Sequence, residues 1–267
     1  MCTTLKWPAD SNENTTTLTL QIPMEVTITN STKEKLDYAF HGDPTDTSLL
    51  VIIGHGVTGN KDRPWAVGLA DAIADAGFAA LRFSYSGNGD SEGDFAKSTI
   101  TKEIKDLKAI VNAAEDAGYH KICYAGHSMG AAVGVLAASR DDRIEMLISL
   151  AGMVDTARFC KAEFGDVTPG KGNMWDEEGC PLSQEFVDDM MKIKNVSNKT
   201  EKIEASWLIV HGDKDDLVPV EEGREIYAKC YEPKHYVEIA GGDHVFSGKS
   251  LKPMTKAVVE WLEEQQI

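Results

Sequence analysis

The sequence predicts an α/β fold in which helices cover both faces of a mostly parallel central sheet. Two observations predict this fold: the alternation of apolar and amphipathic stretches, and the size of the core that the composition allows. From about residue 48 onward, short apolar stretches with the length of buried strands alternate with amphipathic stretches that have the period of a helix. In such an alternation, each helix is the crossover between two parallel strands. The chain has 267 residues, 42% of them hydrophobic, which is enough for one large core.

The first expected element is an antiparallel hairpin, because residues 24–29 and 34–40 have strand character and flank the polar turn 30–33. The parallel strands and their crossover helices follow. Pro64 and Pro219 suit the first turns of two of these helices. We expect strands at 48–53, 78–84, 120–125, 145–151, 205–211 and 234–240, and helices at 64–76, 99–117, 129–139, 219–231 and 250–265.

Residues 152–202 interrupt this alternation. They follow a strand, contain several glycines and prolines, and hold a short acidic helix candidate at 183–194. Long excursions in compact domains are usually functional or disordered, and ligands of open parallel sheets bind at the carboxyl edge. We therefore expect a core made of residues 1–151 and 203–267, with 152–202 as a lid. The alternative is a surface excursion without a role in substrate binding.

The formal net charge of −16, from 43 acidic and 27 basic residues, limits the classes of partner. An acidic surface repels nucleic-acid phosphates and anionic lipids, so we expect neither nucleic acid nor a membrane as partner. The N-terminal residues lack the apolar core of a signal peptide, and the apolar run 48–54 is too short to span a bilayer. We therefore expect a cytoplasmic protein. Its oligomeric state stays open, with a homodimer as one option.

The cysteines and glycines indicate neither a metal site nor a cofactor site. Five scattered cysteines favour free thiols in a reducing compartment, and a Cys160–Cys180 pair in an oxidising compartment is the alternative. No cluster of His, Cys, Asp or Glu has metal-ligand spacing. The glycine-rich stretch 86–93 lacks the lysine and the spacing of phosphate-binding loops. We expect no metal and no cofactor.

Ser128 stands between two glycines at the junction of an expected strand and an expected helix. The stretch Gly126-His-Ser-Met-Gly fits G-x-S-x-G. In that pattern a sharp, strained turn projects the serine above the sheet, and the glycines allow close packing of the strand and the helix. The N–H groups at the start of the helix point toward the same site. Ser128 is therefore a candidate nucleophile.

A base and an acid follow Ser128 in the chain. His244 comes directly after the expected strand 234–240, and Asp213, Asp215 and Asp216 follow the strand before it. A serine hydroxyl needs a base to take its proton, a histidine can return that proton, and an aspartate fixes the histidine tautomer. The order Ser, Asp, His differs from the orders in chymotrypsin and subtilisin. The other histidines are expected to be structural or on the surface: His41, His55, His120, His127, His211 and His235.

These motifs resemble the α/β-hydrolase superfamily over roughly residues 20 to 265. More narrowly, the chain resembles the small lidded carboxylesterases, which include cinnamoyl (feruloyl) esterases and serine aminopeptidase-like hydrolases. The resemblance is carried by five stretches in the right order: Gly54-His-Gly-Val-Thr-Gly-Asn-Lys-Asp-Arg, Leu81-Arg-Phe-Ser-Tyr-Ser-Gly-Asn-Gly-Asp-Ser-Glu-Gly, Gly126-His-Ser-Met-Gly, His211-Gly-Asp-Lys-Asp-Asp-Leu-Val-Pro and Gly242-Asp-His.

The resemblance implies roles for three further positions. The family pattern G-x-x-D-x-x-V-P falls on residues 212–219 and makes Asp215 the acid. A tetrahedral intermediate needs two N–H donors, and one should be the backbone N–H of Met129, directly after the nucleophile. The second should come from the loop 55–59, where the resemblance assigns the backbone N–H of Val57.

The sequence thus predicts a cofactor-free serine hydrolase that cleaves a small-molecule carboxylic ester through an acyl-enzyme. Amide or thioester cleavage by the same triad is one alternative, because acyl transfer uses the same groups. A small-molecule binding protein that has lost catalysis is another. Specificity is expected to lie in 152–202, and the resemblance admits an aromatic acyl group. Candidate pocket walls, each of which could equally be lid core, are Phe159, Phe164, Met174, Trp175 and Phe186.

Overall fold

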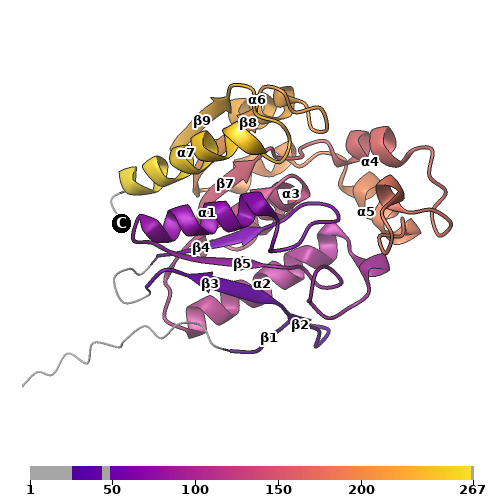
Figure 1. Cartoon of the computed structure of the whole chain (residues 1–267), viewed down its shortest axis with the longest axis horizontal. Helices are drawn as coiled ribbons and strands as arrows, with labels where there is room; N and C mark the ends of the chain where they lie inside the picture. Colours follow the sequence, from indigo (N-terminus) through magenta and orange to yellow (C-terminus); the bar gives the residue numbers. More distant parts are fainter. Residues whose placement is uncertain (1–25, 44–48, 266–267) are drawn as a thin grey trace, which may run out of the picture.

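The computed structural model of the chain describes residues 26–43 and 49–265 (Figure 1). Its centre is a seven-stranded sheet in the order β3-β5-β4-β6-β7-β8-β9. All neighbouring strands are parallel except β3 and β5, so the predicted, mostly parallel sheet is confirmed. The strands are β3 Tyr38–His41, β4 Leu49–Gly54, β5 Ala79–Phe83, β6 Lys121–His127, β7 Ile144–Leu150, β8 Ser206–Gly212 and β9 Lys234–Ile239.

The N-terminal hairpin forms, but its second arm divides. β1 (Ile28–Thr29) pairs antiparallel with β2 (Lys35–Leu36). β3 then leaves the hairpin and joins the edge of the main sheet, antiparallel to β5. Between them, the N–H of Asp37 donates to Ser91 Oγ at 2.8 Å and its carbonyl accepts from the N–H of Ser84 at 2.9 Å. Residues 24, 25 and 48 of the expected strands lie outside the described residues.

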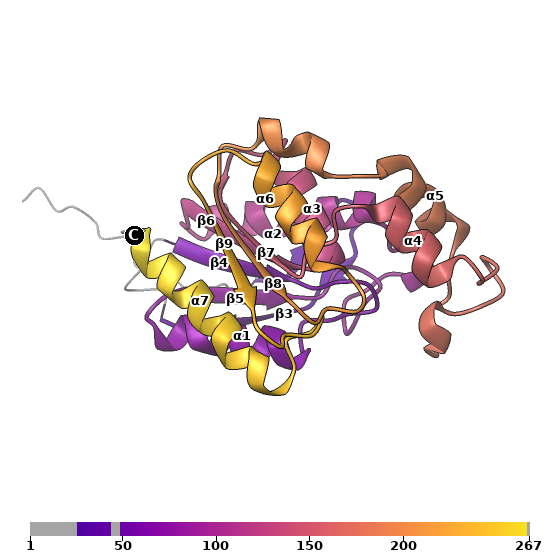
Figure 2. The ribbon, with the colours of Figure 1, turned by 90° about the horizontal axis from the view of Figure 1, so that it is seen from above.

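Helices cover both faces of the sheet, as predicted (Figure 2). α1 and α7 pack on one face, and α2, α3 and α6 pack on the other. The alternation along β4 shows why. Leu50 and Ile52 join the core on the α2 side, whereas Leu49, Val51 and Ile53 join the core on the α1 side. The helices are α1 Pro64–Asp75, α2 Ile100–Asp116, α3 Met129–Ala138, α6 Val220–Lys229 and α7 Leu251–Glu264.

The segment 152–202 forms two helices beside one end of the sheet (Figure 1). α5 (Gln184–Ile193) matches the expected acidic helix. α4 (Thr156–Phe164) was not expected, although it has recognisable signals. The side chain of Asp155 accepts from the N–H of Arg158, which caps the helix start, and the buried side chains of Thr156, Phe159, Cys160 and Phe164 lie on one face. Short 3₁₀ helices complete the structure at Phe95–Lys97, Met174–Asp176, Ser197–Lys202 and Gly248–Ser250.

Polar contacts on two sides attach this segment to the rest of the molecule. The buried carboxylate of Glu222, in the first turn of α6, accepts from the N–H groups of Val154 and Asp155 and pairs with Arg158. On the other side, Asp189 of α5 accepts from the N–H of Thr101 at 3.0 Å, in the first turn of α2. A carboxylate at a helix N-terminus is favoured by the helix dipole. Within the described ranges, no helix combines the length and the apolar character needed to cross a membrane.

Candidate active site

Ser128 occupies a strained turn between β6 and α3. β6 ends at His127 and α3 begins at Met129, and Ser128 between them has φ 55° and ψ −119°. Few residues other than glycine adopt such a backbone conformation, and functional sites are where it concentrates. The turn is held by the N–H of Ser128, which donates to the carbonyl of Leu150 at the end of β7 at 2.9 Å. The strained turn predicted from G-x-S-x-G is therefore present at Ser128.

The two glycines of the motif are required by close backbone approaches. A Cβ at Gly126 would lie 2.3 Å from the carbonyl oxygen of Gly130, and a Cβ at Gly130 would lie 2.5 Å from the carbonyl oxygen of His55. Both contacts are far shorter than van der Waals distance and involve backbone. Gly126 and Gly130 therefore let β6, α3 and the loop after β4 converge beneath Ser128.

Asp215 and His244 meet at the ends of two adjacent strands. Asp215 follows β8, His244 follows β9, and His244 Nδ1 lies 2.9 Å from Asp215 Oδ2. The other carboxylate oxygen of Asp215 accepts from the N–H groups of Leu217 and Val218 at 3.0 and 2.8 Å. Burial opposes ionisation of Asp215, but hydrogen bonds from His211 and His244 outweigh it and hold the pKa of Asp215 well below its usual value. Asp215 is therefore an ionised carboxylate directed at the His244 ring.

His211 is a further partner of Asp215. Its Nε2 lies 2.9 Å from the carbonyl oxygen of Val218 and 3.2 Å from Asp215 Oδ2, so this nitrogen carries the proton. Its Nδ1 is buried without a hydrogen-bond partner among the described residues, which fits an unprotonated nitrogen. His211 therefore donates through Nε2 and supports the loop, in line with the structural role expected of it. Its contact with Asp215 was not predicted from the sequence.

His127 holds the backbone of the loop that carries His244. Its Nε2 donates to the carbonyl of His244 at 2.7 Å, and its ring packs on Trp65 with centroids 4.6 Å apart. Burial, together with the charge of nearby His244, lowers the pKa of His127 to about 3. His127 therefore stays neutral and structural, as its place in the turn motif suggested. His244 is also nearly buried, at 8% exposure.

The loop after β4 passes directly against Ser128. A Cβ at Gly56 would lie 2.8 Å from Ser128 Cβ and 3.2 Å from Ser128 Oγ. His55 braces this loop, because its Nδ1 donates to the carbonyl of Gly56 at 2.8 Å and its Nε2 accepts from the N–H of Tyr85 at 3.1 Å. Burial lowers the pKa of His55 to about 4, so the ring is neutral. The loop thus has a fixed position beside Ser128.

The two expected oxyanion donors belong to the two segments next to Ser128. Val57 belongs to the loop after β4, and Met129 is the first residue of α3. Within the described part of the chain, neither backbone N–H donates a hydrogen bond to a protein acceptor. Thr58, the residue after Val57, has φ 52°, and its carbonyl accepts from the Arg63 guanidinium at 2.7 Å. Both N–H groups are therefore available to a ligand.

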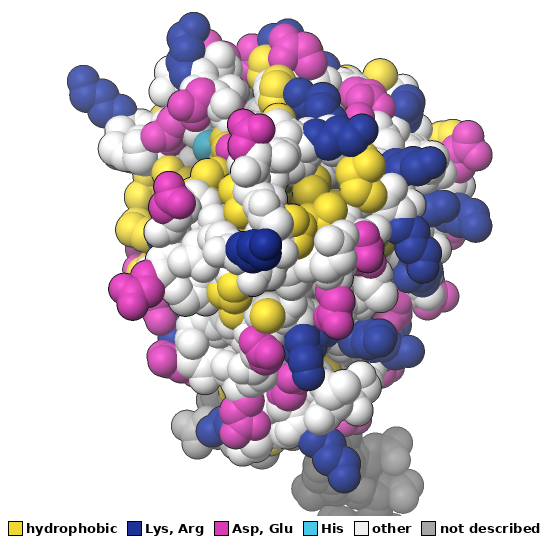
Figure 3. Space-filling model, turned by 90° about the vertical axis from the view of Figure 1, so that its right-hand side faces the viewer, with side chains coloured by type: hydrophobic (Ala, Val, Ile, Leu, Met, Phe, Trp, Pro, Cys, Tyr) yellow, Lys and Arg dark blue, Asp and Glu magenta, His cyan; other side chains and the backbone are white. Residues whose placement is uncertain are grey.

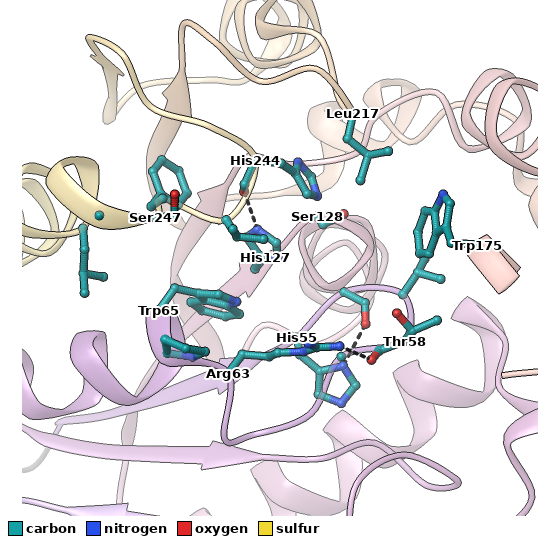
Figure 4. Close-up of a pocket in the computed structure, with 18 residues that line it drawn as sticks. His55, Thr58, Arg63, Trp65, His127, Ser128, Trp175, Leu217, His244 and Ser247 are labelled. Carbon is teal, nitrogen blue, oxygen red and sulfur yellow. Dashed lines mark hydrogen bonds between the residues drawn. The ribbon is translucent and has the colours of Figure 1, made fainter. Parts of the chain in front are cut away.

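Ser128 and His244 line one cavity of about 380 Å³, which is in the size range of small-molecule sites (Figure 4). In this structure Ser128 Oγ makes no hydrogen bond to His244, and such contacts are often looser in free enzymes. Figure 3 shows apolar side chains gathered around a hollow on the face of the molecule that bears the 152–202 segment. The other residues that line the cavity are His55, Gly56, Val57, Thr58, Gly59, Arg63, Pro64, Trp65, His127, Trp175, Leu217, Val245, Phe246, Ser247, Gly248 and Leu251.

Of the expected pocket walls, only Trp175 lines this cavity. Phe159 and Phe164 lie behind Trp175, and each is 3% exposed. The centroids of their rings are 6.3 and 4.9 Å from the centroid of the Trp175 ring, respectively. Met174 and Phe186 are likewise buried. These side chains face inward because the amphipathic helices α4 and α5 bury their apolar faces against each other. Among the described residues, no three His, Cys, Asp or Glu side chains gather as a metal site.

A family model described as the prolyl oligopeptidase family matches residues 68–265. The chain belongs to this family. The match covers β5 to α7, and so includes Ser128, Asp215 and His244. Together with the folds of similar structures, it identifies this prolyl oligopeptidase family member as a hydrolase of the α/β-hydrolase superfamily. The predicted superfamily and fold class are therefore confirmed.

Two solved structures and one sequence relative illustrate what this prolyl oligopeptidase family member is similar to. The structure of Est1E from Butyrivibrio proteoclasticus with ferulic acid bound has a TM-score of 0.77 and 28% identity, covering 90% of this chain and 98% of Est1E. A monoacylglycerol lipase from Paleococcus ferrophilus shares the fold, with a TM-score of 0.67, 22% identity and coverage of 85% and 98%. The uncharacterised protein YfhR of Salmonella typhi is 24% identical over 231 residues, which are 83% of this chain and 74% of YfhR.

Proposed function

We propose that this protein is a serine hydrolase that cleaves small carboxylic esters through an acyl-enzyme formed on Ser128. The observation that carries the proposal is the contact between the buried, ionised carboxylate of Asp215 and His244 Nδ1 at 2.9 Å. His244 lines the same cavity as Ser128. An aspartate that binds Nδ1–H leaves Nε2 unprotonated, and Nε2 is then the base that a serine nucleophile needs. The similarity to Est1E supports an ester as the substrate.

In the proposed first step, Ser128 Oγ attacks the ester carbonyl while His244 Nε2 takes the hydroxyl proton. Asp215 stabilises the imidazolium that results. The tetrahedral oxyanion accepts hydrogen bonds from the backbone N–H groups of Val57 and Met129. Collapse of this intermediate breaks the bond to the alcohol oxygen, and His244 returns the proton to the leaving alcohol.

In the proposed second step, a water molecule attacks the acyl-enzyme carbonyl. His244 takes a proton from this water, the oxyanion forms again at the same two N–H groups, and Ser128 leaves with the proton that His244 holds. The products are a carboxylic acid and an alcohol, and the protein returns to its starting state. No group beyond those of the chain and one water molecule is needed.

We further propose that residues 152–202 act as a lid that selects the substrate. This segment supplies Trp175 to the cavity wall, and the buried rings of Phe159 and Phe164 support Trp175 from behind. Trp175 is 40% exposed, which is high for a side chain of its size. An apolar wall of this kind suits an acyl chain or an aromatic acyl group, such as the ferulic acid that Est1E binds.

Peptide cleavage by the same triad is a second candidate, and the match to the prolyl oligopeptidase family favours it. The two candidates share every catalytic group, because acyl transfer from an ester and from an amide passes through the same intermediates. They differ in the leaving group and in what the cavity accepts.

The test is hydrolysis of p-nitrophenyl esters from acetate to palmitate and of methyl ferulate, alongside aminoacyl and prolyl p-nitroanilides. Wild type and Ser128→Ala are compared, and the Ser128 peptide is examined by mass spectrometry after treatment with a fluorophosphonate. We expect ester turnover that is lost in Ser128→Ala, and a label on Ser128. Turnover of anilides alone would favour the peptidase. Tight ligand binding without turnover or label would favour a non-catalytic binding protein.

A further inference from the structure

Arg63 brings a positive charge into the wall of the cavity that contains Ser128 (Figure 4). Among the described residues that line this cavity, it is the single Lys or Arg, and none is Asp or Glu. The rest of the wall is largely apolar, with neutral His55 and His127 among its polar groups. A guanidinium in such surroundings interacts more strongly with an anion than it would in water.

Arg63 has no acidic partner in the described part of the chain. Its guanidinium donates one hydrogen bond, to the carbonyl of Thr58 at 2.7 Å. The chain carries 43 acidic residues, and most other arginines use one or two of them: Arg82, Arg143, Arg158 and Arg224 all form ion pairs. A guanidinium has five N–H donors, so several donors of Arg63 remain for a ligand.

Helix stability does not account for an arginine at this position. Arg63 is the N-cap residue of α1, and its side chain makes no capping hydrogen bond. A cation near a helix N-terminus is disfavoured by the helix dipole, and the residues preferred there are Ser, Thr, Asp and Asn. The arginine is therefore unfavourable for the helix while it contributes charge to the cavity.

We propose that Arg63 selects esters that carry a carboxylate away from the scissile bond, and that its guanidinium binds this carboxylate in the Michaelis complex. This inference rests on the proposed esterase function and names the class of its substrate. Guanidinium and carboxylate match in geometry and form charge-assisted, often bidentate hydrogen bonds. A neutral substrate of the same shape would leave the guanidinium without that partner and would be discriminated against.

Arg63 also braces Thr58, so a loss of activity in an Arg63 variant would not by itself reveal anion binding. The informative quantity is the ratio of kcat/KM for an anionic ester to kcat/KM for its isosteric neutral amide. This ratio cancels any change in the loop after β4 that affects both substrates. Arg63→Gln removes the charge but keeps an N–H donor for Thr58, and Arg63→Lys keeps the charge. Arg140→Gln is the matched control, because Arg140 is exposed and lies outside this cavity.

Two substrate pairs separate a carboxylate on the acyl side from one on the alcohol side. Monomethyl glutarate is paired with methyl glutaramate, and 3-acetoxybenzoate is paired with 3-acetoxybenzamide; release of acid is followed in a pH-stat. In at least one pair we expect Arg63→Gln to lower the ratio about 10- to 100-fold, the range for a hydrogen bond to a charged group. Arg63→Lys should retain part of the ratio, and Arg140→Gln should leave it unchanged.

The outcomes distinguish this inference from the proposed function on which it rests. Equal ratios in wild type and Arg63→Gln for both pairs would overturn the anion subsite, even if Arg63→Gln is a slower enzyme. Ser128-dependent hydrolysis of the neutral amides would in that case leave the esterase proposal standing. If no ester is hydrolysed in a Ser128-dependent manner, the proposed function itself fails, and the subsite for an ester substrate fails with it.

Discussion

Two tyrosine hydroxyls meet beneath the strained turn at Ser128, and their removal should have unequal effects on stability. Tyr85 and Tyr124 are fully buried, with hydroxyl oxygens 2.5 Å apart. The Tyr124 hydroxyl also lies 3.0 Å from the carbonyl oxygen of Gly130 in α3. A carbonyl only accepts, so the Tyr124 proton goes to Gly130 and the Tyr85 proton goes to Tyr124. This direction determines what each substitution leaves without a partner.

Tyr85→Phe removes one neutral hydrogen bond and leaves the Tyr124 donor satisfied, so it should destabilise by about 1 kcal/mol. Tyr124→Phe removes two hydrogen bonds and leaves the buried Tyr85 hydroxyl with no acceptor. It should destabilise by about 2–3 kcal/mol, because an unsatisfied buried donor adds its own desolvation penalty. In the double variant that donor is gone. Tyr85→Phe should therefore be neutral or stabilising in the Tyr124→Phe background, although it is destabilising in the wild type.

Urea unfolding, followed by fluorescence and far-UV circular dichroism, gives the midpoint and slope for the four proteins of this cycle. Tyr119→Phe is the matched control, because the Tyr119 hydroxyl is buried without a hydrogen-bond partner among the described residues. Its removal should leave stability unchanged or raise it. Additive losses from Tyr85→Phe and Tyr124→Phe, or a larger loss from Tyr85→Phe, would refute the assigned direction of the two hydrogen bonds.

Three further substitutions test two parts of the site and one buried carboxyl group in α2. Asp215→Asn removes the ionised partner of His244, the proposed base, and should lower kcat roughly 10,000-fold in the ester assay. The control Asp216→Asn changes an exposed residue and should stay near wild type. Equal losses in the two variants would reject Asp215 as the acid. Gly56→Ala places a Cβ 2.8 Å from Ser128 Cβ and should abolish both ester turnover and fluorophosphonate labelling of Ser128. Full labelling of the variant would contradict the close approach of the loop after β4 to Ser128. Burial, followed by the charge of Asp106, raises the pKa of Glu103 well above its usual value. The folded state therefore keeps a proton on Glu103 that the unfolded chain releases above about pH 4.3. The wild-type protein should therefore lose stability as the pH rises above that value, whereas Glu103→Gln has no proton to release at this position. The difference between the urea midpoints of Glu103→Gln and wild type should shift in favour of the variant from pH 4 to pH 8. A difference that stays constant over this range would reject the raised pKa.

The central sheet could be predicted from the sequence because its signals are local. Each strand is a short apolar run, each crossover helix has its own period, and the carboxyl ends of parallel strands gather at one edge. That rule alone predicts that Ser128, Asp215 and His244 lie at the same edge. The meeting of Asp215 with His244 follows from β8 and β9 being neighbours.

The cavity wall could not be predicted in the same way. Phe159, Phe164 and Trp175 belong to a segment rich in turns, and composition gives each the same chance of facing the cavity. Trp175 differs because its backbone is left-handed, with φ 50°, as is that of Asp176, with φ 57°. The angle at Trp175 depends on the tertiary packing of the segment, since a residue as bulky as tryptophan rarely adopts it. The departure of β3 from the hairpin likewise depends on β5, which is distant in sequence.

Tyr85 shows why the supporting residues of a site are harder to recognise than its reactive ones. In the sequence Tyr85 and Tyr124 follow or lie in apolar strands, where an aromatic residue indicates core packing. In the structure Tyr85 also donates its backbone N–H to His55, which braces the loop of Val57, while its hydroxyl reaches α3 through Tyr124. The segments that carry the two proposed oxyanion donors are thus tied to one residue. Since such donors act only when their spacing matches the transition state, rigid attachment of both segments to Tyr85 serves the chemistry as well as the fold.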